Sequence, residues 1–181
     1  VMQRREFLKT SSLTGAAALT GLAGETVRAA EGPREFYELR AYEMPTGNRK
    51  AQLNDYLAKA AIPAWNRAGS GPVGVFTVLS GANGLTLYVL VPHPSLEAFL
   101  AAPEKLEADP DYKKASADYA RRTIDDPAYT RYETWLLRAF ANVPRLRVPA
   151  ETAEKKPRLF ELRIYESHSE AAARKKIAMF N

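Results

Sequence analysis

The fold is decided by a seven-residue stretch, Tyr-Glu-Leu-Arg-Ala-Tyr-Glu at residues 37–43, which recurs as Phe-Glu-Leu-Arg-Ile-Tyr-Glu at residues 160–166. Five of the seven positions are identical, and polar and apolar side chains alternate in both copies. Such alternation predicts a β-strand with two different faces, and the repeat indicates two related modules in one chain. We therefore expect a complete module at 34–141, a proline-containing linker at 142–157, and the truncated start of a second module at 158–181.

Outward from this first strand, the chain continues with helical and strand patterns in turn. Apolar residues recur at helical spacing from Leu53 to Ala64, and Pro63 is expected to kink or end that helix. The expected elements are strands at 35–43, 73–80, 85–91 and 131–140, and helices beginning near 48, at 96–101 and at 110–122. This order, β-α-β-β-α-β, is the ferredoxin-like pattern of the α+β class.

Composition is that of a folded domain, with 46% hydrophobic and 26% charged residues in 181. The formal net charge of +5 is spread along the chain without a block of Lys and Arg, so we expect no nucleic-acid partner. The absence of cysteine excludes disulfides, thiolate metal sites and a cysteine nucleophile.

Residues 1–29 have the order of parts found in an export signal. The opening resembles the twin-arginine motif, and a short, weakly apolar run at 13–23 follows it. Small residues then predict cleavage after Ala29, although retention as an uncleaved anchor or a plain amphipathic helix would also fit. The motif residues are Arg4, Arg5, Phe7, Leu8 and Lys9. We therefore expect a periplasmic or secreted protein whose partners include the twin-arginine export machinery.

Several short segments together resemble the NIPSNAP family. They are the opening at 37–42, Val-Gly-Val-Phe at 73–76, Ala-Asp-Pro-Asp-Tyr at 108–112 and Tyr-Glu-Thr-Trp-Leu-Leu at 132–137. The resemblance implies a dimeric α+β barrel, in which two four-stranded sheets face each other with helices outside. The partner sheet would come from a second copy, as a homo-oligomer, or from the second module, as an intrachain pseudo-dimer.

Strand alternation divides each copy of the repeat into an apolar and a polar face. We expect the apolar face, such as Leu39, to pack under the helices, and the polar face to look into the space between two sheets. An arginine beside a glutamate and a tyrosine there could orient a ligand carboxylate or carbonyl. A polar ladder that only fixes strand register is the alternative. The candidate ligand-binding residues are Glu38, Arg40, Tyr42, Glu161, Arg163 and Tyr165.

His93 is the remaining candidate. It follows the strand at 85–91 between two prolines, where it would act as a general base or lie in an exposed turn. No ligand set for a metal surrounds it in the sequence, and no cofactor is assigned. The pattern favours an exported binding or interaction module of undetermined role. The alternative is a small enzyme, cofactor-independent and oxygenase-like or haem-handling, that would use a closed cavity between the sheets.

Overall fold

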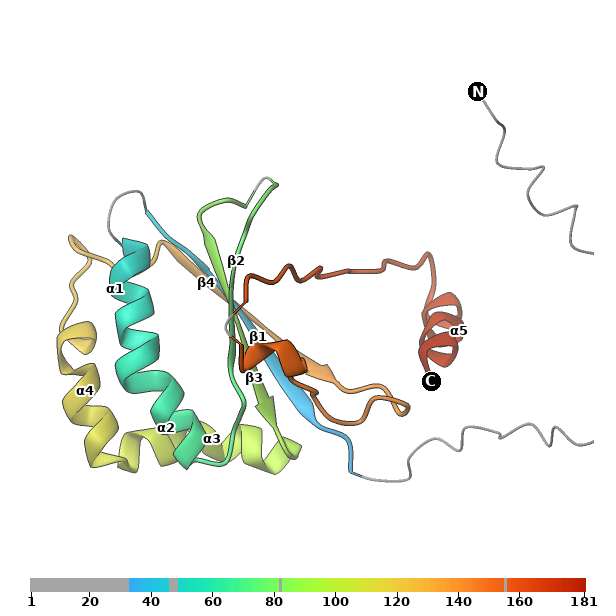
Figure 1. Cartoon of the computed structure of the whole chain (residues 1–181), viewed down its shortest axis with the longest axis horizontal. Helices are drawn as coiled ribbons and strands as arrows, with labels where there is room; N and C mark the ends of the chain where they lie inside the picture. Colours follow the sequence, from blue (N-terminus) through green and yellow to red (C-terminus); the bar gives the residue numbers. More distant parts are fainter. Residues whose placement is uncertain (1–32, 46–48, 82, 155) are drawn as a thin grey trace, which may run out of the picture.

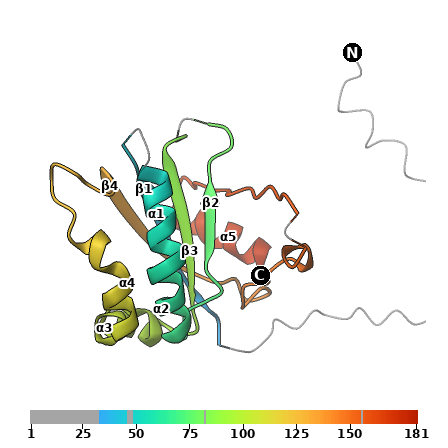
Figure 2. The ribbon, with the colours of Figure 1, turned by 60° about the vertical axis from the view of Figure 1, so that its left-hand side comes forward.

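The computed structural model describes residues 33–45, 49–81, 83–154 and 156–181. The predicted export signal and its cleavage site after Ala29 therefore lie outside the described residues, and they stay predictions. In the described part, one four-stranded antiparallel sheet has the strand order β2-β3-β1-β4. Four helices lie together on one side of this sheet, and the C-terminal segment lies on the other (Figures 1 and 2). The α+β class is thus confirmed.

The elements follow the predicted β-α-β-β-α-β order, with the second helical part divided in two. They are β1 (Phe36–Glu43), α1 (Arg49–Tyr56), a π-helical turn (Leu57–Ala61), α2 (Ile62–Arg67), β2 (Gly74–Thr77), β3 (Thr86–His93), α3 (Leu96–Ala108), α4 (Pro110–Ala120), β4 (Arg131–Arg138), a 3-10 turn (Ala150–Thr152) and α5 (Glu170–Phe180). Within the described residues, no helix combines the length and the apolar character needed to cross a bilayer.

Of the two outcomes expected at Pro63, a kink or an end of the helix, the end does not occur. The helical path does not end there but continues to Arg67, and a π-helical turn at Leu57–Ala61 directly precedes the proline-containing turn. A proline has no N–H to donate and its ring crowds the preceding turn, so a locally widened helix accommodates it. The consequence is that Trp65, two residues later, still lies on a helix and faces the sheet.

The helix at α3 is longer than predicted. Ser95 caps its N-terminus as expected, with Oγ accepting from the N–H of Ala98 at 3.2 Å. The helix then runs through Pro103 to Ala108, beyond the predicted end at 101. Asp109 then caps α4, with Oδ1 accepting from the N–H groups of Asp111 and Tyr112. This length carries α3 beside the sheet, where it forms one wall of the cavity described below.

The hydrophobic core lies between the sheet and the helices. On β3, Leu87, Val89 and Val91 are completely buried and face the helical layer. The helices supply the other side of the core. Its helical members are Leu53, Leu57, Ala61, Ala64, Trp65 and Leu106. Burial of this set is the main favourable contribution to the fold, because apolar area removed from water stabilises by about 25 cal/mol per Å².

The orientation expected for β1 is wrong. Arg40 is paired in register with Val89, whose side chain is in the core beneath the helices, so the polar face of β1 also faces the helices. Leu39 and Ala41 lie on the opposite side, which the helices do not cover, and are nevertheless 9% and 5% exposed. Polarity therefore did not indicate which face the helices protect.

The repeated segment at 160–166 is extended, but it joins no strand in the described part of the chain. The ring of Phe160 packs edge-on against Phe76 of β2, with 5.1 Å between centroids. The helix that follows, α5, was expected from its basic, alanine-rich sequence and is present. Its Phe180 stacks near Phe140, just after β4. The assignment of 158–181 as a second module stays a prediction.

Candidate functional site

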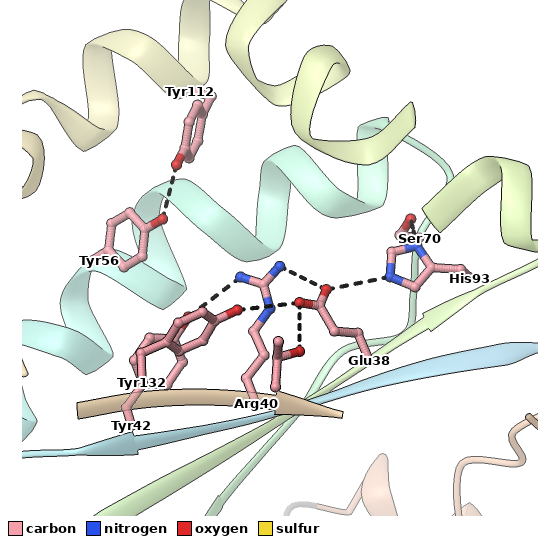
Figure 3. A network of polar contacts seen from close by, with 9 residues as sticks. Glu38, Arg40, Tyr42, Tyr56, Ser70, His93, Tyr112 and Tyr132 are labelled. Carbon is pink, nitrogen blue, oxygen red and sulfur yellow. Dashed lines mark hydrogen bonds and ion pairs between the residues drawn. The ribbon is translucent and has the colours of Figure 1, made fainter. Parts of the chain in front are cut away.

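Glu38 is the centre of a buried polar cluster on the helix-facing side of the sheet (Figure 3). Its side chain comes from the central strand β1 and the residue is only 6% exposed. Oε2 accepts a hydrogen bond from Nη2 of Arg40 at 2.8 Å. Oε1 accepts from the hydroxyls of Thr134 and Tyr132 on β4, at 3.1 and 3.3 Å. Both carboxylate oxygens are therefore held by donors from two adjacent strands.

Arg40 lies between this carboxylate and aromatic rings. Its guanidinium carbon is 4.6 Å from the ring centroid of Trp65, and Nη1 is 3.4 Å from the hydroxyl of Tyr42. An arginine stacked on an aromatic face gains a cation–π attraction in addition to its ion pair. Burial lowers the pKa of Arg40, but the hydrogen bond that it donates to Glu38 and the charges around it outweigh burial and raise the pKa. The site thus holds a permanent cation.

The charge on Glu38 is maintained by its neighbours. Burial alone raises the pKa of its carboxyl, but the polar contact with His93, together with the hydrogen bond and charge of Arg40, outweighs burial and lowers the pKa to about 2. Burial is also the main reason that the pKa of Tyr132 is raised to about 12. At neutral pH the cluster therefore contains one carboxylate, one guanidinium and uncharged tyrosines.

His93 is not in an exposed turn, as its flanking prolines suggested, but is the last residue of β3 and completely buried. Nδ1 is hydrogen-bonded to the hydroxyl of Ser70 at 2.9 Å, and Nε2 is 3.8 Å from Oε2 of Glu38. The second distance is too long for a hydrogen bond. Ser, His and Glu are the residue types of a hydrolytic triad, but Ser70 is 1% exposed and cannot attack a substrate.

A cavity of about 360 Å³ adjoins the cluster. Its floor is formed by Glu38 and Arg40 of β1 and by Tyr132 of β4, and α2, α3 and α4 form its walls. The wall residues include Trp65, Phe99, Glu107 and Tyr112. The volume is at the lower end of the range for small-molecule sites, and the mixture of aromatic walls with a few polar groups is typical of them.

The structure brings four of the seven predicted residues together and leaves three apart. Glu38, Arg40, Tyr42 and His93 form the cluster. In the second copy of the repeat, Arg163 donates to Glu161 at 2.7 Å, but their side chains are 63% and 67% exposed. The same pair thus forms locally in both copies, and only the first is buried. Tyr165 instead packs beside Phe180 of α5.

Sequence reasoning missed Trp65, Ser70, Tyr132 and Thr134. Tyr132 and Thr134 lie two residues apart on a predicted strand, and their side chains therefore share one face. Two hydroxyl groups on one face of this strand could have indicated that they belong to the site. Ser70 was assigned to a connector, and nothing local indicates that it meets a histidine 23 positions away. Among the residues that the structure describes, no group of three potential metal ligands comes together.

Comparison with known proteins identifies the family. The NIPSNAP family model matches residues 37–128, just over half of the chain. The chain belongs to the NIPSNAP family. The match begins with β1 and ends before β4. It therefore includes α1 to α4 and the buried ion pair of Glu38 and Arg40.

Solved structures of NIPSNAP proteins are also similar to this chain. A NIPSNAP-like domain protein from Burkholderia xenovorans matches this NIPSNAP chain with 16% identity and a TM-score of 0.50, covering 64% of this chain and 94% of its own. A NIPSNAP family protein of unknown function from Agrobacterium tumefaciens matches with 18% identity and a TM-score of 0.46, covering 59% and 89%. At these identities the likeness extends to the fold alone. No curated protein matches the sequence.

Proposed function

We propose that this NIPSNAP chain is an exported binding module that holds a small molecule in the cavity between its sheet and its helices. The observation that carries this proposal is the charged pair of Glu38 and Arg40 at the cavity floor. A buried ion pair often stabilises a domain no more than apolar residues of similar volume would, because desolvation of both charges offsets their attraction. Its position beside an aromatic-walled cavity supports a role in recognition.

The opposite face of the sheet supports a second part of the proposal, which is self-association. Trp135 and Leu137 on β4 are each 42% exposed on the face that the helices do not cover. Large apolar side chains gathered on one face are typical of a protein interface. This face would pair with a second copy of the chain or with a complete second module. The ligand cavity and the interface would then lie on opposite faces of the sheet.

Mass spectrometry of small molecules retained by the purified, natively folded chain tests the binding role. We expect a stoichiometric ligand that is lost in Arg40→Met, which keeps much of the side-chain volume but removes the donors and the charge. Glu161→Gln, in the exposed copy of the pair, is the matched control and should retain the ligand. Equal ligand content in all three proteins would contradict the proposal. Recovery of haem, or of a chemically converted ligand, would instead support the enzyme alternative.

Export is tested separately. Arg4→Lys combined with Arg5→Lys should leave a reporter fused to this chain in the cytoplasm, because the twin-arginine route requires the paired arginines. Continued export of the double variant would remove that part of the proposal without affecting the cavity.

A further inference from the structure

The charges around the cavity limit which ligands it can accept. Arg40 is the only cationic side chain among the described residues that line it, and Glu38 already neutralises that charge at 2.8 Å. Glu107, on α3, adds a second carboxylate at the cavity. No ion pair to Glu107 occurs in the described part of the chain. At neutral pH the lining therefore has a net negative charge, which disfavours an anionic ligand.

The hydrogen-bonding groups of the cavity limit the ligand further. Arginine has five N–H donors and no acceptor. In Arg40, Nη2 donates to Glu38, while the partner of Nη1 is the hydroxyl of Tyr42 at the long distance of 3.4 Å. The oxygens of Glu38 already accept from Arg40, Tyr132 and Thr134. The floor of the cavity thus offers N–H donors of Arg40 that are not fully used, so it would favour a ligand that accepts a hydrogen bond there.

The volume and the aromatic walls of the cavity indicate the size and the kind of ligand that fits. Phe99, Tyr112 and Tyr132 contribute aromatic faces from three elements, and about 360 Å³ of space lies between them. Flat rings pack against aromatic side chains more favourably than branched aliphatic groups of the same size. From charge, donors and walls together, and on the basis of the proposed binding function, we propose that the cavity takes an uncharged aromatic compound whose carbonyl oxygen accepts from Arg40. Carboxylates of the same size are disfavoured by the net negative charge that Glu107 gives the lining. An amidinium in the same position is disfavoured because it brings N–H donors, and no acceptor, to the donors of Arg40.

Three isosteric probes separate these requirements. Benzamide is neutral with a carbonyl acceptor, benzoate is an anion with acceptors, and benzamidine is a cation without an acceptor. Their dissociation constants are measured by NMR titration of the full chain at neutral pH, following the indole N–H signal of Trp65. We expect benzamide to bind about tenfold more tightly than benzoate, the scale of one partly screened charge interaction. It should also bind more tightly than benzamidine, which has no acceptor for the donors of Arg40.

Two variants test the cause of this preference. Glu107→Gln should bring benzoate to within about twofold of benzamide by removing the unpaired carboxylate. Glu104→Gln, on the same helix but outside the cavity lining, should leave the order of the probes unchanged. Benzoate or benzamidine binding as tightly as benzamide in the natural sequence would overturn the inference and leave the binding function intact. Failure of all three probes to bind would overturn both.

Discussion

Glu38→Gln tests most sharply how the buried pair is held. Glutamine keeps an oxygen that can accept from Tyr132 and Thr134, but it no longer balances the charge of Arg40. Removal of one partner of a buried pair costs about 3–5 kcal/mol, because the other charge stays buried. The lowering of the Glu38 pKa from 4.5 to about 2 corresponds to about 3 kcal/mol. Solvent in the adjoining cavity screens part of this, so we expect a loss of about 2 kcal/mol.

The assay is urea unfolding of the natural chain, Glu38→Gln and the control Glu161→Gln at pH 7 and in steps down to about pH 3. Because the folded pKa of Glu38 is below its unfolded value, its charge stabilises the fold fully above about pH 4.5 and progressively less as the pH falls towards 2. The difference between Glu38→Gln and the natural chain should shrink over that interval. Glu161→Gln, whose side chain is 67% exposed, should match the natural chain throughout. A neutral-pH difference below about 0.5 kcal/mol, or one independent of pH, would refute the reasoning.

Three further variants probe other parts of the molecule. Ser70→Ala leaves Nδ1 of the buried His93 without its partner and should cost about 1–3 kcal/mol in urea unfolding, and no loss would mean that a water replaces the hydroxyl. Tyr56→Phe removes the 2.9 Å contact to the hydroxyl of Tyr112 and should cost about 1 kcal/mol, whereas a stabilised variant would show that the pair is not formed. Trp135→Glu places a charge on the open sheet face and should reduce the mass measured by light scattering at high protein concentration. An unchanged mass would argue against association through this face.

The order and class of the elements were predictable because each rests on local signals. The alternation at 37–43, the cap at Ser95 and the Asp109-Pro110 helix start are all readable over a few residues. The helix ends were less predictable. Pro63 and Pro103 both lie within helical paths, because packing against the sheet compensates for the hydrogen bond that a proline removes. Such compensation depends on tertiary contacts and leaves no local pattern.

The orientation of β1 could not be read from polarity. Alternation shows that a strand has two faces, but residues on both faces of β1 are buried, so neither polarity nor burial marks the helical side. Glu38 and Arg40 can lie in the core because they form an ion pair with each other. The hydroxyls of Tyr132 and Thr134, from a strand almost a hundred residues later, donate to the other oxygen of Glu38. That pairing depends on the register of β4 against β1, which no segment of the sequence encodes alone.

The two tryptophans of the chain allow the central claim, that the ligand lies between the sheet and the helices, to be tested in one measurement. Trp65 is 2% exposed and lines the cavity, whereas Trp135 is 42% exposed on the other face of the sheet. In an NMR titration with benzamide, the indole N–H signal of Trp65 should move and saturate while that of Trp135 stays fixed. Movement of the Trp135 signal with a stationary Trp65 signal would mean that the ligand binds on the open face of the sheet, and would contradict this account.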